Sequence, residues 1–374
     1  MRKLKIAMFG HKRIPSREGG IEIVVRELST RMAALGHDVV CYNRKSHHVS
    51  SAEFNTCKDT IFEGVRLKTV PTWNKKGLAA VSSSFFAALY ASFSDAGTVH
   101  IHAEGPAFLC WLPRLFGKHV VVTIHGLDWQ REKWKNSLAV WYIRMGEKMA
   151  VRWAHEIIVL SKSAQDYFLS AYGRRTVRIP NGAARPLYRA PDLIRKEYGL
   201  EAEGYILFVG RLVPEKGIHY LIDAFRQLDI PKKLVIAGAS SDTDDYCEKL
   251  RVMAAGDDRI LFTGFVQDQM LQELYSNAWV YVLPSDVEGM PMSLLEAMSY
   301  GNCCVVSDIP ECTQVAEGRL LAFPKGDVED LGRTLLALYR DQQKVTDMRA
   351  QAADSVCKAY SWDRIVQQTL ELYR

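Results

Sequence analysis

The stretch EGMPMSLLE (288–296) follows an apolar run, WVYVLP (279–284), and opens a segment of helical spacing. An apolar run, a turn and a helix in this order form the repeating unit of a parallel α/β sheet. Glu296 lies about two helical turns beyond Glu288, close to the same helix face. Backbone amides at a helix start hold phosphate, and a carboxylate further along accepts hydrogen bonds from a ribose diol. The segment therefore predicts a nucleotide-diphosphate site in a parallel sheet.

The same unit recurs along nearly the whole chain, which indicates two α/β domains. The linker is expected in IPNGAARPLYRAPD (179–192), which is rich in Pro and contains Asn-Gly. We expect an N-terminal domain over 1–184 and a C-terminal domain over 185–359, with a cleft between them. Strands are expected near 4–9, 38–42, 98–102, 119–124, 156–160, 176–179, 205–209, 233–237, 259–262, 279–283 and 302–306. Ligands of such sheets bind beyond the carboxyl ends of the strands, so the strand-to-helix loops are where a site is expected.

Composition narrows the functional classes. The chain has 374 residues, 48% of them hydrophobic and 24% charged, with a net charge of +5. These values are typical of a globular protein of two domains. We expect no signal peptide, no transmembrane helix and no nucleic-acid partner. The eight cysteines form no Cys-x-x-Cys pair, which favours reduced thiols in a cytoplasmic protein over disulfides or zinc.

The first candidate loop is HKRIPSREGGIE (11–22), which precedes a helix expected to end at Gly36. Gly19 and Gly20 let the backbone approach a ligand closely at the helix start. The loop is not the Gly-x-Gly-x-x-Gly of dinucleotide enzymes, and a charged surface turn is the alternative interpretation.

The second candidate loop is GRLVPEKG (210–217), directly after the apolar run YILFV. Arg211 and Lys216 are expected to point at one anion, with a planar fork from arginine and a compact charge from lysine. Two cations suit a departing diphosphate, on which negative charge develops. The alternative is a solvated loop in which Lys216 pairs with Glu215.

The third candidate loop is TIHGLDW (123–129), in which His125 ends a strand. An imidazole there is suited to bind a sugar hydroxyl or polarise a reacting group, although a lone histidine is more often structural. Glu22, Glu104 and Asp128, which lie in loops of the first half, are candidates for the acceptor side.

Two further segments have open interpretations. Asp242 and Asp244 have the Asp-x-Asp spacing of some metal–diphosphate sites, but capping of the following helix is favoured, and no metal site is predicted. The stretch WNKKGLAAVSSSFFAALYASF (73–93) puts two lysines before an apolar helix. It is suited to a membrane surface, but a buried helix of the N-terminal sheet is the favoured interpretation.

The motifs GGIE (19–22), HGLDW (125–129), IPNG (179–182), GRLVPEKG and EGMPMSLLEAMSYG (288–301) occur in one order. In that order they resemble the retaining GT-B glycosyltransferases of family 4, and the resemblance covers essentially the entire chain. The opening loop together with HGLDWQREKW is most similar to a bacterial subgroup that builds surface polysaccharides and includes rhamnosyltransferases. The resemblance implies the GT-B fold, an α/β fold of two Rossmann-like domains that face each other across a cleft.

The resemblance also implies roles for single residues. Arg211 and Lys216 would neutralise the diphosphate, Glu288 and His125 would contact the donor sugar, and Glu296 would bind the ribose. The full donor-binding set is Gly19, Gly20, Gly210, Arg211, Lys216, Val266, Glu288, Gly289, Met290, Pro291, Leu295 and Glu296, with His125, Arg211, Lys216 and Glu288 as the catalytic residues. Met290 departs from the Phe or Leu of many relatives, a change of similar volume. The final segment, 360–374, would cross back onto the N-terminal domain.

The function expected from this resemblance is sugar transfer from a nucleotide-diphosphate sugar to a saccharide or lipid-linked acceptor. It would proceed with retention and without metal or cofactor, in the cytoplasm or at the inner face of the cell membrane. Two alternatives remain: a sugar-nucleotide epimerase of the same fold, and a non-catalytic sugar-nucleotide binding subunit.

Overall fold

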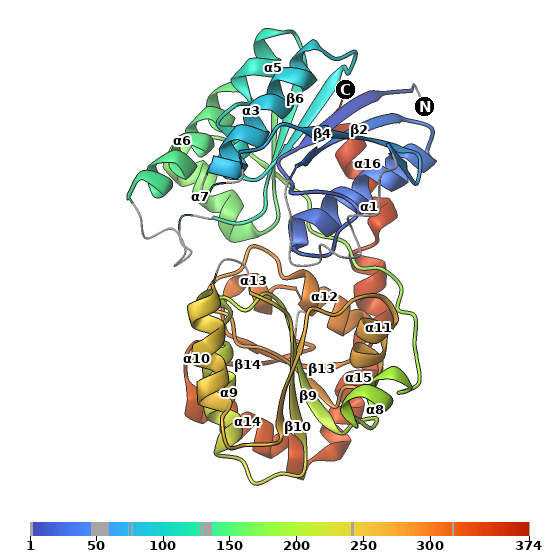
Figure 1. Cartoon of the computed structure of the whole chain (residues 1–374), viewed down its shortest axis with the longest axis vertical. Helices are drawn as coiled ribbons and strands as arrows, with labels where there is room; N and C mark the ends of the chain where they lie inside the picture. The colour runs from blue at the N-terminus through green and yellow to red at the C-terminus, as the bar shows by residue number, and fades with distance from the viewer. Residues whose placement is uncertain are drawn as a thin grey trace. The chain divides into compact units, whose positions relative to one another are not determined.

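The structure is a computed structural model that describes residues 3–45, 60–73, 75, 78–127, 129, 137–240, 243–315 and 318–373. The chain divides into two compact units (Figure 1). The N-terminal unit comprises Met1–Asn181 and Trp362–Arg374, and the C-terminal unit comprises Gly182–Ser361. The linker motif had placed the division after residue 184.

The N-terminal unit is built on an eight-stranded sheet in the order β3-β4-β2-β1-β5-β6-β7-β8. Every neighbouring pair is parallel except β3 and β4. The strands are β1 (Lys5–Phe9), β2 (Asp38–Arg44), β3 (Ile61–Phe62), β4 (Val65–Val70), β5 (Thr98–His102), β6 (His119–Ile124), β7 (Glu156–Val159) and β8 (Val177–Arg178). The helices are α1 (Gly20–Ala34), α3 (Leu78–Phe93), α4 (Glu104–Ala107), α5 (Trp111–Leu115), α6 (Ser137–Trp153), α7 (Lys162–Tyr172) and α16 (Trp362–Glu371).

Helices cover both faces of this sheet. α1 packs beside the C-terminal helix α16, whereas α3, α4, α5 and α6 contact one another on the other side (Figure 1). Helix α1 forms where apolar residues recur at helical spacing, and the chain leaves it through Gly36, whose φ of +89° suits glycine. The central strands β1, β5 and β6 are almost fully buried, as parallel strands covered on both faces must be.

The C-terminal unit has a six-stranded parallel sheet in the order β11-β10-β9-β12-β13-β14. Its strands are β9 (Tyr205–Val209), β10 (Lys233–Ala237), β11 (Ile260–Gly264), β12 (Val280–Leu283), β13 (Cys303–Ser307) and β14 (Leu321–Phe323). Its helices are α8 (Leu193–Tyr198), the single 3₁₀ turn Pro214–Lys216, α9 (Ile218–Arg226), α10 (Asp244–Ala254), α11 (Asp268–Asn277), α12 (Met292–Ser299), α13 (Pro310–Thr313), α14 (Val328–Arg340) and α15 (Gln342–Ala359). α9, α10 and α14 cover one face, and α8, α11, α12 and α15 cover the other (Figure 1).

All eleven strands expected from the sequence are present, which confirms the α/β fold class. Among the described residues, three strands were missed: β3, β4 and β14. Within the described residues, no helix is both long enough and apolar enough to cross a bilayer.

Each sheet has a switch point at which the chain reverses its direction of travel across the strands. In the N-terminal sheet it lies between β1 and β5, and in the C-terminal sheet between β9 and β12. The loops at the carboxyl ends of strands beside a switch point diverge and leave a crevice in which ligands bind. Both switch points are flanked by loops that the sequence singled out.

Candidate functional site

Two loops meet at the switch point of the C-terminal sheet. One follows β9 and the other follows β12. Gly217 in the first has a φ of +64°, and a Cβ atom built on it would lie 1.9 Å from the Pro284 carbonyl oxygen in the second. The Asp286 amide donates a hydrogen bond of 2.9 Å to the Glu215 carbonyl oxygen. The two loops therefore pack backbone against backbone, and only glycine fits at position 217.

This packing brings Lys216 to Glu288. The Lys216 Nζ lies 2.5 Å from Glu288 Oε1, and the two side chains are 13% and 9% exposed. The Ser285 hydroxyl donates to the same carboxylate oxygen at 2.7 Å. Lys216 thus pairs with Glu288 of the neighbouring loop, and the alternative pairing with Glu215 is wrong. A nearly buried cation and anion now stand together at the carboxyl edge of the sheet.

Arg211 brings a second cation to the same edge. It is half-buried and follows Gly210 directly after β9. Gly210 is enclosed by the end of β10, because a Cβ atom on Gly238 would lie 1.8 Å from the Gly210 carbonyl oxygen. The loop that carries Arg211 and Lys216 is therefore fixed at both of its ends by close backbone contacts.

The second carboxylate of the opening motif, Glu296, lies in α12. Its Oε2 accepts a hydrogen bond of 3.3 Å from the Tyr275 hydroxyl. The Tyr275 ring stacks on Tyr300, with ring centroids 5.4 Å apart. Glu296 is half-buried, so its carboxylate is held in place and still reachable by water.

The other donor-side candidates differ in how open they are. Gly289, Met290 and Pro291 form the buried turn before α12. Leu295 is fully buried and its amide donates to the Pro291 carbonyl oxygen, so its donor contact stays a prediction. Val266 is half-buried just beyond β11, which β9 and β10 separate from β12.

The switch point of the N-terminal sheet is lined by histidines. A Cβ atom on Gly10, whose φ is +108°, would lie 2.1 Å from the His102 carbonyl oxygen, so the loop after β1 presses against the end of β5. His102 Nδ1 lies 3.1 Å from His125 Nε2, and the His100 and His102 rings are 4.1 Å apart. His100 Nδ1 in turn lies 2.6 Å from the hydroxyl of Tyr373, which follows α16.

Burial favours the neutral form of three histidines at this switch point, His11, His100 and His102. Burial lowers the pKa of His102 well below its usual range, and the nearby His100 and His125 rings lower it further. Burial also lowers the pKa of His11 to about 4 and that of His100 to about 3. His102 Nε2 is buried and has no hydrogen-bond partner among the described residues, which favours a bare lone pair there. A proton on His102 Nδ1 would then donate to His125 Nε2.

The Glu22 side chain holds the loop over residues 11–22 in place by a hydrogen bond to the start of that loop. Gly19 precedes the first residue of α1, Gly20, and a Cβ atom on Gly19 would lie 2.6 Å from Glu22 Oε2. Glu22 Oε1 accepts a hydrogen bond of 2.8 Å from the Lys12 amide. Burial alone would raise the pKa of Glu22, but the bond from Lys12 and its charge outweigh burial, and the pKa is lowered. Glu22 is therefore an ionised group that holds the loop, and its acceptor role stays a prediction.

Of the remaining acceptor-side candidates, Glu104 is buried and Asp128 is not among the described residues. Glu104 begins α4 and is fully buried. A Cβ atom on Gly146 would lie 1.9 Å from the Glu104 carbonyl oxygen, so α6 passes close to it. Asp128 lies outside the described residues, as does Asp242. Among the residues that are described, no group of three His, Cys, Asp or Glu side chains is placed to hold a metal ion.

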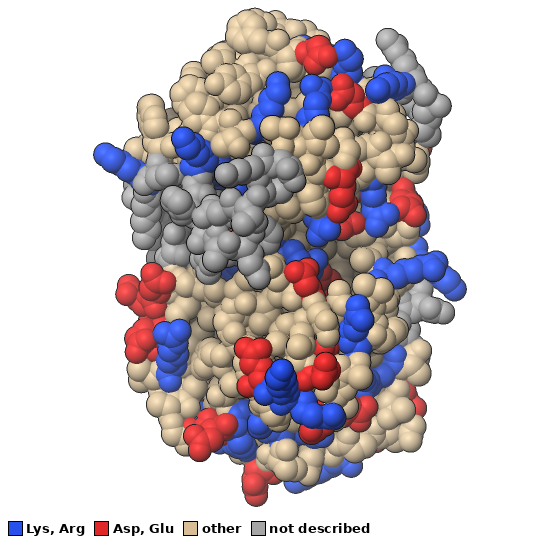
Figure 2. Space-filling view, turned by 45° about the vertical axis from the view of Figure 1, so that its right-hand side comes forward, with Lys and Arg blue, Asp and Glu red and all other residues tan. Residues whose placement is uncertain are grey.

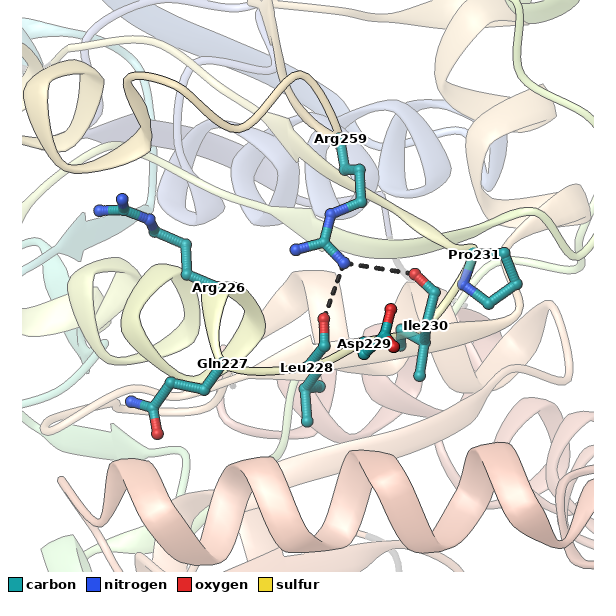
Figure 3. Close-up of a pocket in the computed structure, with 7 residues that line it drawn as sticks. All are labelled: Arg226, Gln227, Leu228, Asp229, Ile230, Pro231 and Arg259. Carbon is teal, nitrogen blue, oxygen red and sulfur yellow. Dashed lines mark hydrogen bonds between the residues drawn. The ribbon is translucent and has the colours of Figure 1, made fainter.

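A surface pocket of about 560 Å³ lies at the opposite edge of the C-terminal sheet, before β10 and β11 (Figure 3). Its most prominent side chain, Arg259, donates to the carbonyl oxygens of Leu228 and Ile230 at 2.7 and 3.3 Å. The same guanidinium pairs with Asp257 at 2.7 Å. Arg259 therefore fastens the loop before β10, and the pocket lies away from the carboxyl ends where ligands of such sheets bind.

Comparison with known proteins agrees with this geometry. Residues 18–184 match the family model for glycosyltransferase family 4, and residues 192–355 match that for glycosyl transferases group 1. The two glycosyltransferase models together cover most of the chain, which supports a GT-B glycosyltransferase of family 4. The first matched segment lies mostly in the N-terminal unit and begins after β1, and the second lies within the C-terminal unit and contains the loops after β9 and β12.

Curated relatives of this chain are distant. An uncharacterised glycosyltransferase of Methanocaldococcus jannaschii is 33% identical over 186 residues, 48% of this chain and 47% of the relative. The O-antigen chain mannosyltransferase B of Escherichia coli is 28% identical over 187 residues, 48% of each. The chain thus spans about half the length of these two. The alpha-D-kanosaminyltransferase of Streptomyces kanamyceticus is 26% identical over 305 residues, 74% of this chain and 76% of the relative.

Solved structures confirm the GT-B fold. The sucrose-phosphate synthase of Thermosynechococcus elongatus superposes with a TM-score of 0.84 at 22% identity, covering 100% of this chain and 98% of that one. Anabaena HepE in complex with UDP-glucose superposes with a TM-score of 0.81 at 19% identity, covering 98% of each chain.

Sequence reasoning missed three residues that support the candidate side chains. Ser285 bonds Glu288, Tyr275 bonds Glu296, and His102 bonds His125. Only His102 left a signal, because the alternation HIH (100–102) places it on the same face of β5 as His100, at the end of the strand.

Proposed function

We propose that this chain transfers a sugar from a nucleotide-diphosphate sugar to a saccharide or lipid-linked acceptor, with retention of anomeric configuration. The observation that carries the proposal is the contact between Lys216 and Glu288 at the switch point of the C-terminal sheet, 2.5 Å between Nζ and Oε1. A family 4 member with a paired cation and anion at this position has the groups that a donor needs: a charge for the diphosphate and an acceptor for sugar hydroxyls.

Donor binding would redistribute the charges of this pair. Lys216 would be shared between Glu288 and the diphosphate, and Arg211 from the same loop would add a bidentate donor. Glu288 would accept hydrogen bonds from hydroxyls of the sugar. Glu296, already oriented by Tyr275, would accept two from the ribose diol. The amides at the start of α12 would face a phosphate oxygen.

The reaction follows from where charge develops. As the bond between the anomeric carbon and the phosphate oxygen breaks, the sugar becomes oxocarbenium-like and the diphosphate gains negative charge. Lys216 and Arg211 would stabilise that charge in the role a metal ion fills elsewhere. The acceptor hydroxyl would attack from the face the diphosphate leaves, and its proton would pass to a phosphate oxygen. His125 would contact the donor sugar.

Relatives support the coarse substrate class. The names of the Escherichia coli and Streptomyces kanamyceticus relatives describe transfer of a mannosyl and of a kanosaminyl group, and the HepE structure contains UDP-glucose. We extend this to a nucleotide-sugar donor and to surface polysaccharide synthesis on the cytoplasmic side. The opening loop and HGLDWQREKW are most similar to a bacterial surface-polysaccharide subgroup that includes rhamnosyltransferases, but they do not specify the base or the sugar of the donor.

The experiment begins with a thermal-shift panel of nucleotide sugars, since a ligand that binds the native state raises the melting temperature. The donor so identified is incubated with a panel of saccharide and lipid-linked acceptors. Acceptor-dependent release of nucleoside diphosphate is expected, and NMR of the new glycosidic bond should show the donor's anomeric configuration. Donor consumption without acceptor would instead indicate an epimerase. Donor binding without diphosphate release, for every acceptor, would indicate a binding subunit.

A further inference from the structure

Helix α3 has an unusual surface. Its sequence, LAAVSSSFFAALYASF, contains no charged residue in 16 positions. Five of its large apolar side chains are exposed, among them Phe85 at 46% and Phe93 at 68%. Leu78, Val81, Phe85, Leu89 and Phe93 recur at three- and four-residue spacing, so they follow one face of the helix.

The buried side of α3 is the more polar side. Four serines, at 82, 83, 84 and 92, are buried together with Ala87, Ala88 and Ala91. Each of these hydroxyls donates to a carbonyl oxygen of its own helix at 2.7–3.1 Å. The serines thus need no partner in the core, and their small size lets α3 pack closely on its neighbours. Phe86 packs against the core, but most of the bulky apolar groups, which would normally face it, are exposed.

Neighbouring elements extend the apolar surface. The Phe93 ring lies 4.6 Å from that of Phe116, which follows α5 and is exposed together with Leu115. At the other end of the helix the exposed Trp73 donates its amide to Ser82 Oγ at 3.0 Å. We call this surface the α3 face; it consists of Trp73, Leu78, Val81, Phe85, Phe93, Leu115 and Phe116.

Cations border the α3 face. Lys75 stands before α3, and Lys118 donates to the Ser94 carbonyl oxygen just after it at 2.6 Å. Asp95, the nearest acid in the sequence, is paired with Lys5 at 2.7 Å. The N-terminal unit as a whole has 29 Lys and Arg against 16 Asp and Glu, whereas the C-terminal unit has 19 against 27. Figure 2 shows an area without charged side chains at the upper end of the N-terminal unit, where Figure 1 places α5.

We infer that the α3 face docks on an anionic lipid bilayer, with α3 lying in the plane of the interface. An anionic bilayer binds a surface of aromatic and aliphatic groups that is bordered by cations. The apolar side chains enter the boundary of the acyl chains, and the cations contact the anionic headgroups. An exposed tryptophan at one end suits the headgroup level. Charge complementarity favours lipid over a second copy of the chain, because two N-terminal units of like excess charge repel each other.

The test is co-sedimentation of the full chain with phosphatidylcholine vesicles, with and without phosphatidylglycerol, in the absence of any sugar substrate. Its outcome is thus separate from that of the proposed transfer reaction. We expect binding to vesicles that contain phosphatidylglycerol, weakened by added salt. The double variant Phe85→Ser with Phe93→Ser should bind at least tenfold more weakly, and Lys75→Glu several-fold more weakly.

The control also replaces two exposed apolar side chains with serine, but elsewhere: Leu169→Ser in α7 with Val252→Ser in α10. This control should bind like the unaltered chain. All the replaced side chains are exposed, so thermal melting should show that every variant folds. Equal binding by the unaltered chain and the Phe85/Phe93 variant, or no binding to either kind of vesicle, overturns the inference. A dimer in sedimentation velocity that the same double variant abolishes would assign the α3 face to a second copy instead.

Discussion

At the scale of single residues, Lys216 and Glu288 are 72 positions apart in the sequence and form a nearly buried ion pair. Such a pair is a poor source of stability, because the cost of removing both charges from water offsets their attraction. Its placement is better explained by chemistry, since a lysine held at a fixed place by one anion is already positioned for a second. On the proposed function, the pair would be a preorganised diphosphate site whose charge is balanced until the donor arrives.

Replacing Lys216 with alanine should lower kcat/KM by about 30- to 1,000-fold, which corresponds to about 2–4 kcal/mol of lost transition-state stabilisation. The measurement is the rate of nucleoside diphosphate release at saturating acceptor. Lys249→Ala, at an exposed position of α10, is the control and should leave the rate unchanged. The unfolding free energy should also fall, because Glu288 keeps its buried charge without a cation.

A double variant separates these two effects. Lys216→Met with Glu288→Gln removes both charges, so it should regain most of the stability lost in Lys216→Ala while staying inactive. Turnover near that of the unaltered chain, in either the single or the double variant, would show that the pair has no part in diphosphate departure.

The sequence predicted the loops of this site but not its contacts. Gly-rich turns after apolar runs marked both loops, because strand-to-helix units have a strong local pattern. The partner of Lys216 was uncertain, since Glu215 is adjacent and Glu288 is reached only through sheet topology. The order β9-β12, which brings the two loops together, has no local signature in either strand.

At the scale of elements, the loops after β9 and β12 pack tightly against each other. Gly217 makes this possible, because the Pro284 carbonyl oxygen lies where any other residue would have its Cβ atom. Two separate costs arise when a side chain is added at such a glycine. One is the strain of a left-handed conformation, and the other is the collision. The chain contains a second glycine that isolates the first cost.

We expect Gly217→Ala to destabilise the chain more than Gly199→Ala. Both glycines have nearly the same φ, +64° and +60°, so both variants should lose about 1–2 kcal/mol to strain. A Cβ atom at Gly199 meets only the end of the Lys233 side chain at 3.8 Å, whereas at Gly217 it meets backbone at 1.9 Å. Urea unfolding should show the excess cost at Gly217, and donor affinity should fall in that variant alone. Equal midpoints would mean that the loops separate at little cost.

The elements missed from the sequence are short or lie near a sheet edge. β3 has two residues and β14 has three, too few for any periodicity to be detected. β4 reads VRLKTV, with charged side chains at two of its six positions and only its two end residues buried. The buried central strands have long apolar runs, which is why β1, β5 and β9 were predicted nearly to the residue.

At the scale of the whole molecule, titratable groups are unevenly shared between the two units. Of the ten histidines, all but His219 belong to the N-terminal unit. Burial lowers the pKa of His11 to about 4 and that of His100 to about 3. The unfolded chain takes up protons at these imidazoles near pH 6.5, while the folded unit does not. The N-terminal unit should therefore be the acid-sensitive part of the chain.

Because the pKa values of these histidines are lower in the folded chain than in the unfolded chain, acid destabilises the folded chain. The stability that the neutral histidines contribute is fully present above pH 6.5 and is lost as the pH falls from 6.5 toward 4, by about 1.4 kcal/mol per pH unit for each such group.

Seven of the eight tryptophans lie in the N-terminal unit, so tryptophan fluorescence in urea follows that unit. The fluorescence midpoint should drop between about pH 7 and about pH 5. In the variant His11→Gln, which keeps a donor for Asn43, the unfolding midpoint should depend less steeply on pH, because about one proton fewer is taken up on unfolding. The variant His219→Gln should keep the original pH dependence. A midpoint that is constant over this range would mean that the buried histidines gain protons without cost, which would contradict their neutral hydrogen-bonded arrangement.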